Sequence, residues 1–104
     1  MQLYPLKLVT VVGETVIMED IAKEGLSLGA TGYTMSEVIG QGSRSARNVI
    51  ITGEARTLKV EFVVPMEVAY KILAHVSTTY FEYYACIAWL SDVQVVRGQA
   101  YIAG

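Results

Sequence analysis

The strongest constraint on the fold is an order of segments that occurs twice along the chain. In the first half, residues 7–12 form a β-branched run and residues 33–39 are expected to form a second strand, with a helical pattern between them. In the second half, the run 57–64 is followed by a helical pattern and then by 87–90, which 93–96 continues after a bend. Each half is one strand–helix–strand unit. Two such units predict an α+β fold, the ferredoxin-like βαββαβ sandwich, whose four-stranded antiparallel sheet carries two helices on one face.

The first helix is expected to begin with Thr15 as its N-terminal cap. Ile17, Ile21 and Leu28 then recur on one face at helical spacing. Gly29 stands where a glycine normally ends a helix. The second helix is expected to carry Pro65 in its first turn, where the missing N–H costs nothing. Its buried stripe is predicted to be Ala69, Ile72, Leu73, Val76 and Tyr80.

The composition predicts a single domain, 1–104, that assembles with further copies. Apolar residues make up 53% of the chain and charged residues only 17%, which excludes a disordered chain. The two helices can cover only one face of the sheet, yet the runs 62–64 and 87–90 are apolar on both faces. We therefore expect an oligomer in which a second copy covers the other face.

The net charge and the lengths of the apolar runs limit which partners and which location are expected. A net charge of -2 argues against a nucleic-acid binder. An RNA-recognition domain carries basic and aromatic residues together on the exposed face of its third strand, a combination that the strand 58–62 lacks. No apolar run reaches the ~20 residues that span a bilayer, and no signal peptide opens the sequence. The expected location is the cytoplasm.

Few residues offer catalytic chemistry. His75 has no second ligand or nucleophile near it in the sequence, so it is expected on the surface. Cys86 is the only cysteine, which excludes an internal disulfide and a cysteine-based zinc site, and we expect a buried, inert thiol. The acidic residues suggest no catalytic pair. We therefore expect no enzyme, no catalytic residue and no metal site.

Two polar or aromatic segments could bind a ligand. Residues 80–84 hold three tyrosines and a phenylalanine, which could stack on bases. We favour the alternative, in which these rings plug the end of the second helix and line a subunit contact. Residues 40–53 form a long loop, in which 40–48 combine two glycines with serine hydroxyls and two arginines that suit phosphate. From chemistry alone, an anion site and a plain polar hairpin tip both remain open.

Several motifs resemble those of the PII signalling family. Residues 32–42 follow its G-x-T-x-x-E-V-x-G-x-G segment, and 59–65 are similar to its third strand. Residues 43–47 and 80–85 resemble a narrower branch, the cyanobacterial PII-like proteins of the SbtB type. The resemblance covers about residues 7–98.

The resemblance implies a homotrimer that binds adenine nucleotides in clefts between neighbouring subunits. Members of the SbtB type bind AMP, cAMP, ADP and ATP as regulatory ligands, without an obligatory cofactor. They act on the sodium-dependent bicarbonate transporter SbtA, which would hold the protein at the periphery of the inner membrane. The T-loop, residues 40–56 here, would dock on that partner, and residues 98–104 would form a C-terminal tail.

The resemblance also implies which residues bind the nucleotide. They lie on the second strand, the T-loop, the third strand and the start of the fourth strand. They are Thr34, Gly40, Gln41, Gly42, Ser43, Arg44, Arg47, Val63, Ala85, Cys86 and Ile87.

Departures from the family pattern affect which nucleotides the protein is expected to bind and how it can be modified. Residues 40–52 contain no tyrosine, so the modification site of standard PII proteins is missing. Arg44 replaces the glutamine that coordinates magnesium, and Gln94 and Val96 replace two arginines. We therefore expect mono- and diphosphates to bind at least as well as ATP. Two alternatives remain: a carboxysome-associated PII-like sensor of nucleotide or bicarbonate, and a structural trimer that binds nothing.

Overall fold

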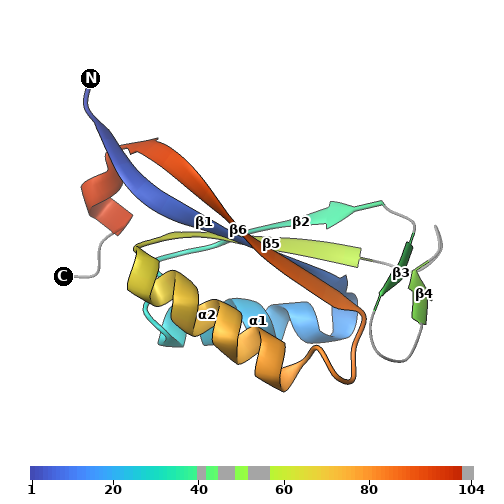
Figure 1. Cartoon of the computed structure of the whole chain (residues 1–104). Helices are drawn as coiled ribbons and strands as arrows, with labels where there is room; N and C mark the ends of the chain where they lie inside the picture. Colours follow the sequence, from blue (N-terminus) through green and yellow to red (C-terminus); the bar gives the residue numbers. More distant parts are fainter. Residues whose placement is uncertain (40–41, 45–48, 52–56, 102–104) are drawn as a thin grey trace.

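The computed structural model describes residues 1–39, 42–44, 49–51 and 57–101. A four-stranded sheet with the order β2-β5-β1-β6 carries two helices on one face (Figure 1). Its elements are β1 (Leu3–Glu14), α1 (Thr15–Ser27), β2 (Thr34–Val38), β5 (Thr57–Val64), α2 (Met66–Thr79) and β6 (Cys86–Val96). All neighbouring strands are antiparallel. The predicted ferredoxin-like βαββαβ fold is confirmed.

The segment expected to be one long loop contains a short hairpin. Strands β3 (Gly42–Arg44) and β4 (Val49–Ile51) pair with each other as a separate two-stranded sheet beside the main one (Figure 1). The Val-Ile-Ile run of β4 explains the difference, since β-branched residues favour extended backbone. Residues 40–41, 45–48 and 52–56 of the T-loop lie outside the described part of the chain.

Strands β1 and β6 are longer than their sequences predict. Residues Leu3 to Gly13 of β1 pair without a gap with Val96 to Cys86 of β6. The bend expected at 91–92 is therefore wrong, because pairing with β1 holds this polar stretch in the ladder. Lys7 forms an ion pair with Asp92, which lies directly opposite it. Since β5 ends opposite Lys7, the outer parts of β1 and β6 continue as a two-stranded ribbon (Figure 1).

The core lies between the sheet and the helices. Alternate residues of β1 and β5 point toward the helices and are fully buried. The core residues include Val9, Val11, Val60, Phe62 and Val64 from the sheet, and Ile17, Met18, Ile21, Ala69, Ile72 and Val76 from the helices. The predicted stripe of the second helix is confirmed, with Leu73 only partly buried. Gly25 lets α1 approach closely, since a Cβ there would lie 2.3 Å from the Phe62 ring.

The two ends of α1 differ in how well their sequences predict them. The N-terminal cap is Glu14 rather than Thr15, because β1 continues through Glu14 and the helix starts directly after it. At the other end Gly29 adopts a φ of 125°. The Gly29 N–H donates to the Leu26 carbonyl at 3.2 Å and the Ala30 N–H to the Gly25 carbonyl at 3.0 Å. This Schellman motif confirms the predicted glycine ending.

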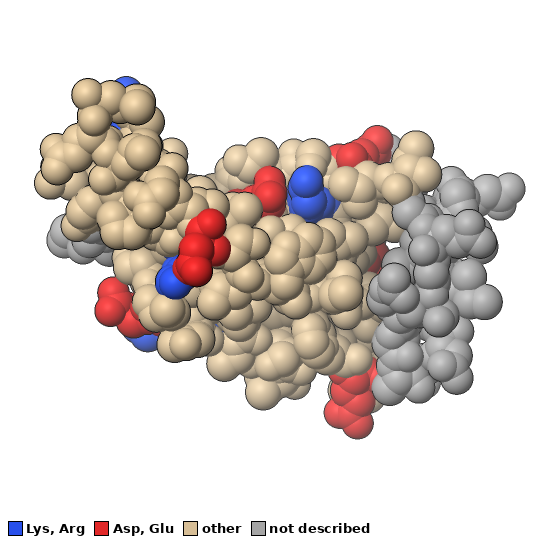
Figure 2. Space-filling model, turned by 45° about the horizontal axis from the view of Figure 1, so that its top comes forward, with Lys and Arg blue, Asp and Glu red and all other residues tan. Residues whose placement is uncertain are grey.

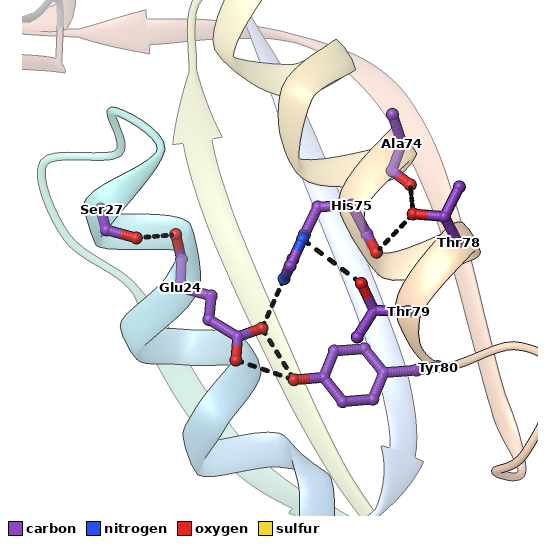
Figure 3. A network of polar contacts seen from close by, with 7 residues as sticks. All are labelled: Glu24, Ser27, Ala74, His75, Thr78, Thr79 and Tyr80. Carbon is purple, nitrogen blue, oxygen red and sulfur yellow. Dashed lines mark hydrogen bonds and ion pairs between the residues drawn. The ribbon is translucent and has the colours of Figure 1, made fainter.

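A polar network joins the two helices, and it includes the histidine expected on the surface (Figure 3). His75 Nε2 lies 2.6 Å from a carboxylate oxygen of Glu24 on α1. The hydroxyl of Tyr80 donates to both oxygens of that carboxylate, at 2.7 and 2.9 Å. Burial, and then the Glu24 carboxylate, raise the pKa of Tyr80 above its usual value. His75 is therefore half-buried and links α2 to α1. The sequence pattern of α2 alone does not reveal this contact.

The position of Tyr80 distinguishes between the two roles considered for the aromatic segment 80–84. It is buried at the C-terminal end of α2, and the Tyr84 ring lies 6.0 Å from its ring. The prediction that these aromatics plug the end of the helix is confirmed for this pair. Among the described residues, neither helix is long and apolar enough to cross a membrane.

Candidate functional site

The face of the sheet away from the helices carries several apolar side chains that no helix of the described chain covers. Strand alternation directs Leu8, Val12 and Val63 to this open face, together with Ile87 and Trp89. Ile87 is 40% exposed and Trp89 is 44% exposed. Figure 2 shows only scattered charged side chains on a mostly uncharged surface.

A hollow of about 360 Å³ lies on this open face. Its lining includes Leu8, Tyr33, Thr34, Glu61, Val63 and Tyr101. Leu8 and Val63 are paired residues of neighbouring strands, and so are Thr34 and Glu61. The hollow therefore brings together Thr34 and Val63, two of the residues predicted to bind a ligand.

The hollow combines apolar, aromatic and polar groups. Leu8 and Val63 offer apolar side chains, while Thr34 offers a hydroxyl and Glu61 a carboxylate. Tyr101 adds an aromatic residue to this lining, whereas the Tyr33 ring packs edge-on against Phe62 of the core, with ring centroids 6.5 Å apart. The described lining contains no lysine or arginine. This chemistry suits a flat, uncharged organic group better than a phosphate.

The predicted residues at the start of β6 lie at the far end of the sheet, toward the β3–β4 hairpin. The Ala85 N–H donates to a carboxylate oxygen of Glu14 at 2.5 Å, and the Glu14 N–H donates to the Ala85 carbonyl at 3.2 Å. Gly13 lies opposite Cys86, and a Cβ at Gly13 would come within 3.1 Å of the Ala85 carbonyl oxygen. This reciprocal contact fixes the chain just before Ile87.

Cys86 is buried, with 8% of its surface exposed. Burial raises the pKa of its thiol to about 11, and the negative charge of Glu14 adds to the effect. The thiolate is the reactive form of cysteine, so this thiol is inert at neutral pH. The predicted burial of this cysteine is confirmed.

One chain does not gather all the predicted site residues. Val63 pairs with Leu8 and Ile87 with Val12, four residues further along β1, which displaces the two groups by about 13 Å along the strand direction alone. Gly42, Ser43 and Arg44 form β3. Gly40, Gln41 and Arg47 lie outside the described residues.

Several residues of the hollow were not predicted from the sequence, among them Glu61, Tyr33 and Tyr101. Glu61 lies two positions before Val63 on the same strand, so strand alternation could have placed it there. Tyr33 precedes Thr34 and could have been included on proximity. Tyr101 carried no signal, since its place depends on a turn after β6. Within the described ranges, no group of three histidine, cysteine or acidic side chains could hold a metal ion.

The fold and the hollow agree with the PII resemblance. A βαββαβ sandwich whose second strand leads into a hairpin, with a hollow on its open face, has the α+β architecture that this resemblance implies. Residues 6–100 match the family model of the nitrogen regulatory protein P-II. The chain therefore belongs to the P-II family.

Solved structures of one more similar protein and of two more distant proteins resemble this chain. A PII-like signaling protein from Thermus thermophilus is 42% identical, with a TM-score of 0.82 over 97% of this chain and 99% of that one. CPII from Thiomonas intermedia, bound to ADP, AMP and acetate, is 23% identical, with a TM-score of 0.84 over 98% and 99%. The GlnK–ATP complex of B. subtilis is 21% identical, with a TM-score of 0.58 over 86% and 82%. The last two share the fold.

Proposed function

We propose that this chain is a non-catalytic regulatory protein of the SbtB type that binds an adenine nucleotide. The hollow that joins Thr34 and Val63 on the open face is the observation that carries the proposal. CPII, a protein of the same fold, is bound to ADP and AMP, and GlnK is bound to ATP. The bound nucleotide acts as a signal and is not turned over.

The distribution of charged residues indicates that two parts of the protein bind the two ends of the nucleotide. The hollow offers apolar and aromatic groups and one carboxylate, Glu61, so it takes the nucleoside end. The phosphate needs cations, which the T-loop supplies as Arg44 and Arg47. With few further cations, the site binds AMP, cAMP and ADP at least as well as ATP.

The complete site forms in a homotrimer. Within one chain, Ala85–Ile87 are displaced from the hollow by about 13 Å along the strands. A neighbouring copy that covers the open face brings its own Ala85–Ile87 to the hollow. Exposed Ile87 and Trp89 provide the apolar surface for that contact.

The proposed partner is the bicarbonate transporter SbtA, which the T-loop contacts at the cytoplasmic face of the inner membrane. A second candidate is a carboxysome-associated sensor of nucleotide and bicarbonate, which the bicarbonate bound in CPII favours. Capture of the transporter from a membrane fraction, released by nucleotide, supports the first candidate. Capture of only shell or enzyme components of the carboxysome supports the second.

Calorimetry with AMP and adenosine tests the nucleotide site. Losing one charge-assisted hydrogen bond costs roughly 1.5–3 kcal/mol, so Arg44→Ala and Arg47→Ala should each weaken AMP binding about 10- to 150-fold. Adenosine has no phosphate and should bind the parent and both variants alike. Lys71→Ala removes an exposed cation on α2 and serves as the control. If both arginine variants bind AMP like the parent, the T-loop does not hold the phosphate.

A further inference from the structure

The chain turns sharply after β6. Arg97 adopts a φ of 64°, which is unusual for a residue with a side chain. It is followed by a short 3₁₀ helix, η1 (Gly98–Tyr101), which contacts β1. Figure 1 shows this helix folded back beside the start of β1. The C-terminal segment therefore returns to the sheet.

A close contact fixes where this turn lies. Gly98 is buried against Tyr4, and a Cβ added to Gly98 would lie 2.4 Å from the Tyr4 Cβ. That atom belongs to the fixed part of the tyrosine, so it cannot move aside as a flexible side-chain end could. The turn can therefore approach β1 this closely only with glycine at position 98.

The turn carries Tyr101 to the hollow. Tyr101 is partly buried and lines the hollow together with Tyr33, Thr34 and Val63. The hollow is therefore built from three distant parts of the sequence: the central strands, the α1–β2 connection and the C-terminal turn.

We propose that Tyr101 is a ligand-contacting residue whose ring packs on the nucleoside part of the bound nucleotide. This inference rests on the proposed function, because the hollow must receive that end of the ligand. An aromatic ring beside apolar Leu8 and Val63 gives a purine a surface on which to stack. Stacking involves no phosphate, so Tyr101 contributes equally to the affinity for adenosine, AMP, ADP and ATP.

Three substitutions test this role by calorimetry with AMP and adenosine. Replacing a stacking aromatic by alanine weakens binding by about 5- to 150-fold, so Tyr101→Ala should lower the affinity for both ligands by the same factor. Tyr101→Phe keeps the ring and should bind within about twofold of the parent. Tyr70→Ala removes a 59% exposed tyrosine of α2 outside the hollow and should bind like the parent.

A fourth substitution moves the ring without removing it. Gly98→Ala displaces the turn from Tyr4 and should weaken both ligands although Tyr101 is intact. Thermal unfolding shows that the binding loss occurs in a folded protein. Parent-like binding of AMP and adenosine by Tyr101→Ala overturns the role of Tyr101 and leaves the proposed function standing. A parent protein that binds neither ligand overturns both.

Discussion

The thiol of Cys86 is controlled by its burial. At pH 8 a thiol with its ordinary pKa of 9.0 is about one tenth ionised, whereas a pKa of about 11 leaves about one part in a thousand as thiolate. Alkylation by iodoacetamide at pH 8 should therefore be about 100-fold slower in the folded protein than in urea, as followed by mass spectrometry. Equal rates in the two states would contradict the burial of this thiol.

The same shift sets a direction for stability against pH. The unfolded thiol loses its proton at a lower pH than the folded thiol, so between pH 9 and 11 the folded state binds more protons. The contribution of Cys86 to stability is complete below pH 9 and is lost as the pH rises to about 11. Cys86→Ala should remove that part of the alkaline loss in urea unfolding.

At the scale of the elements, α1 and α2 are joined by the Glu24 carboxylate, which serves both His75 and Tyr80 (Figure 3). Glu24→Ala leaves the buried Tyr80 hydroxyl without its acceptor, which should cost about 1–3 kcal/mol of unfolding free energy. In a Tyr80→Phe background the hydroxyl is absent, so the same substitution should cost clearly less. Urea unfolding of the two single variants and the double variant measures this coupling. Strictly additive costs would show that the Tyr80–Glu24 bond contributes nothing.

The sequence predicts those elements whose cause is local. The hydrophobic periods and the glycine after α1 suffice for both helices and for the ending at Gly29. The features it misses depend on remote partners. Glu14 stays in β1 and accepts the Ala85 N–H, and the 91–92 segment is held straight by pairing with β1.

The same distinction between local patterns and remote contacts explains which residues of the candidate site could be predicted. Thr34 and Val63 lie at positions that the family pattern marks, and the structure brings them into one hollow. Tyr101 reaches the hollow only through the left-handed turn at Arg97 and the contact of Gly98 with Tyr4. No local pattern of residue types contains that information.

At the scale of the whole molecule, the open sheet face should be the surface that joins the copies. Ile87→Arg places a charge in this apolar surface and should shift the protein from trimer toward monomer in light scattering. Val16→Arg adds the same charge at a position of α1 that is 72% exposed, and should leave the trimer intact. A parent-sized Ile87→Arg assembly would show that the copies meet elsewhere, or not at all.

Native mass spectrometry with AMP tests the central claim most directly, because it reports assembly and ligand together. We predict a species of about three times the 11.4 kDa of one chain, with AMP added in steps up to one per chain. Ile87→Arg should lose the trimer and most of the bound AMP together, because the site forms between copies. A monomer, or a trimer that takes up no AMP at millimolar concentration, would contradict the account.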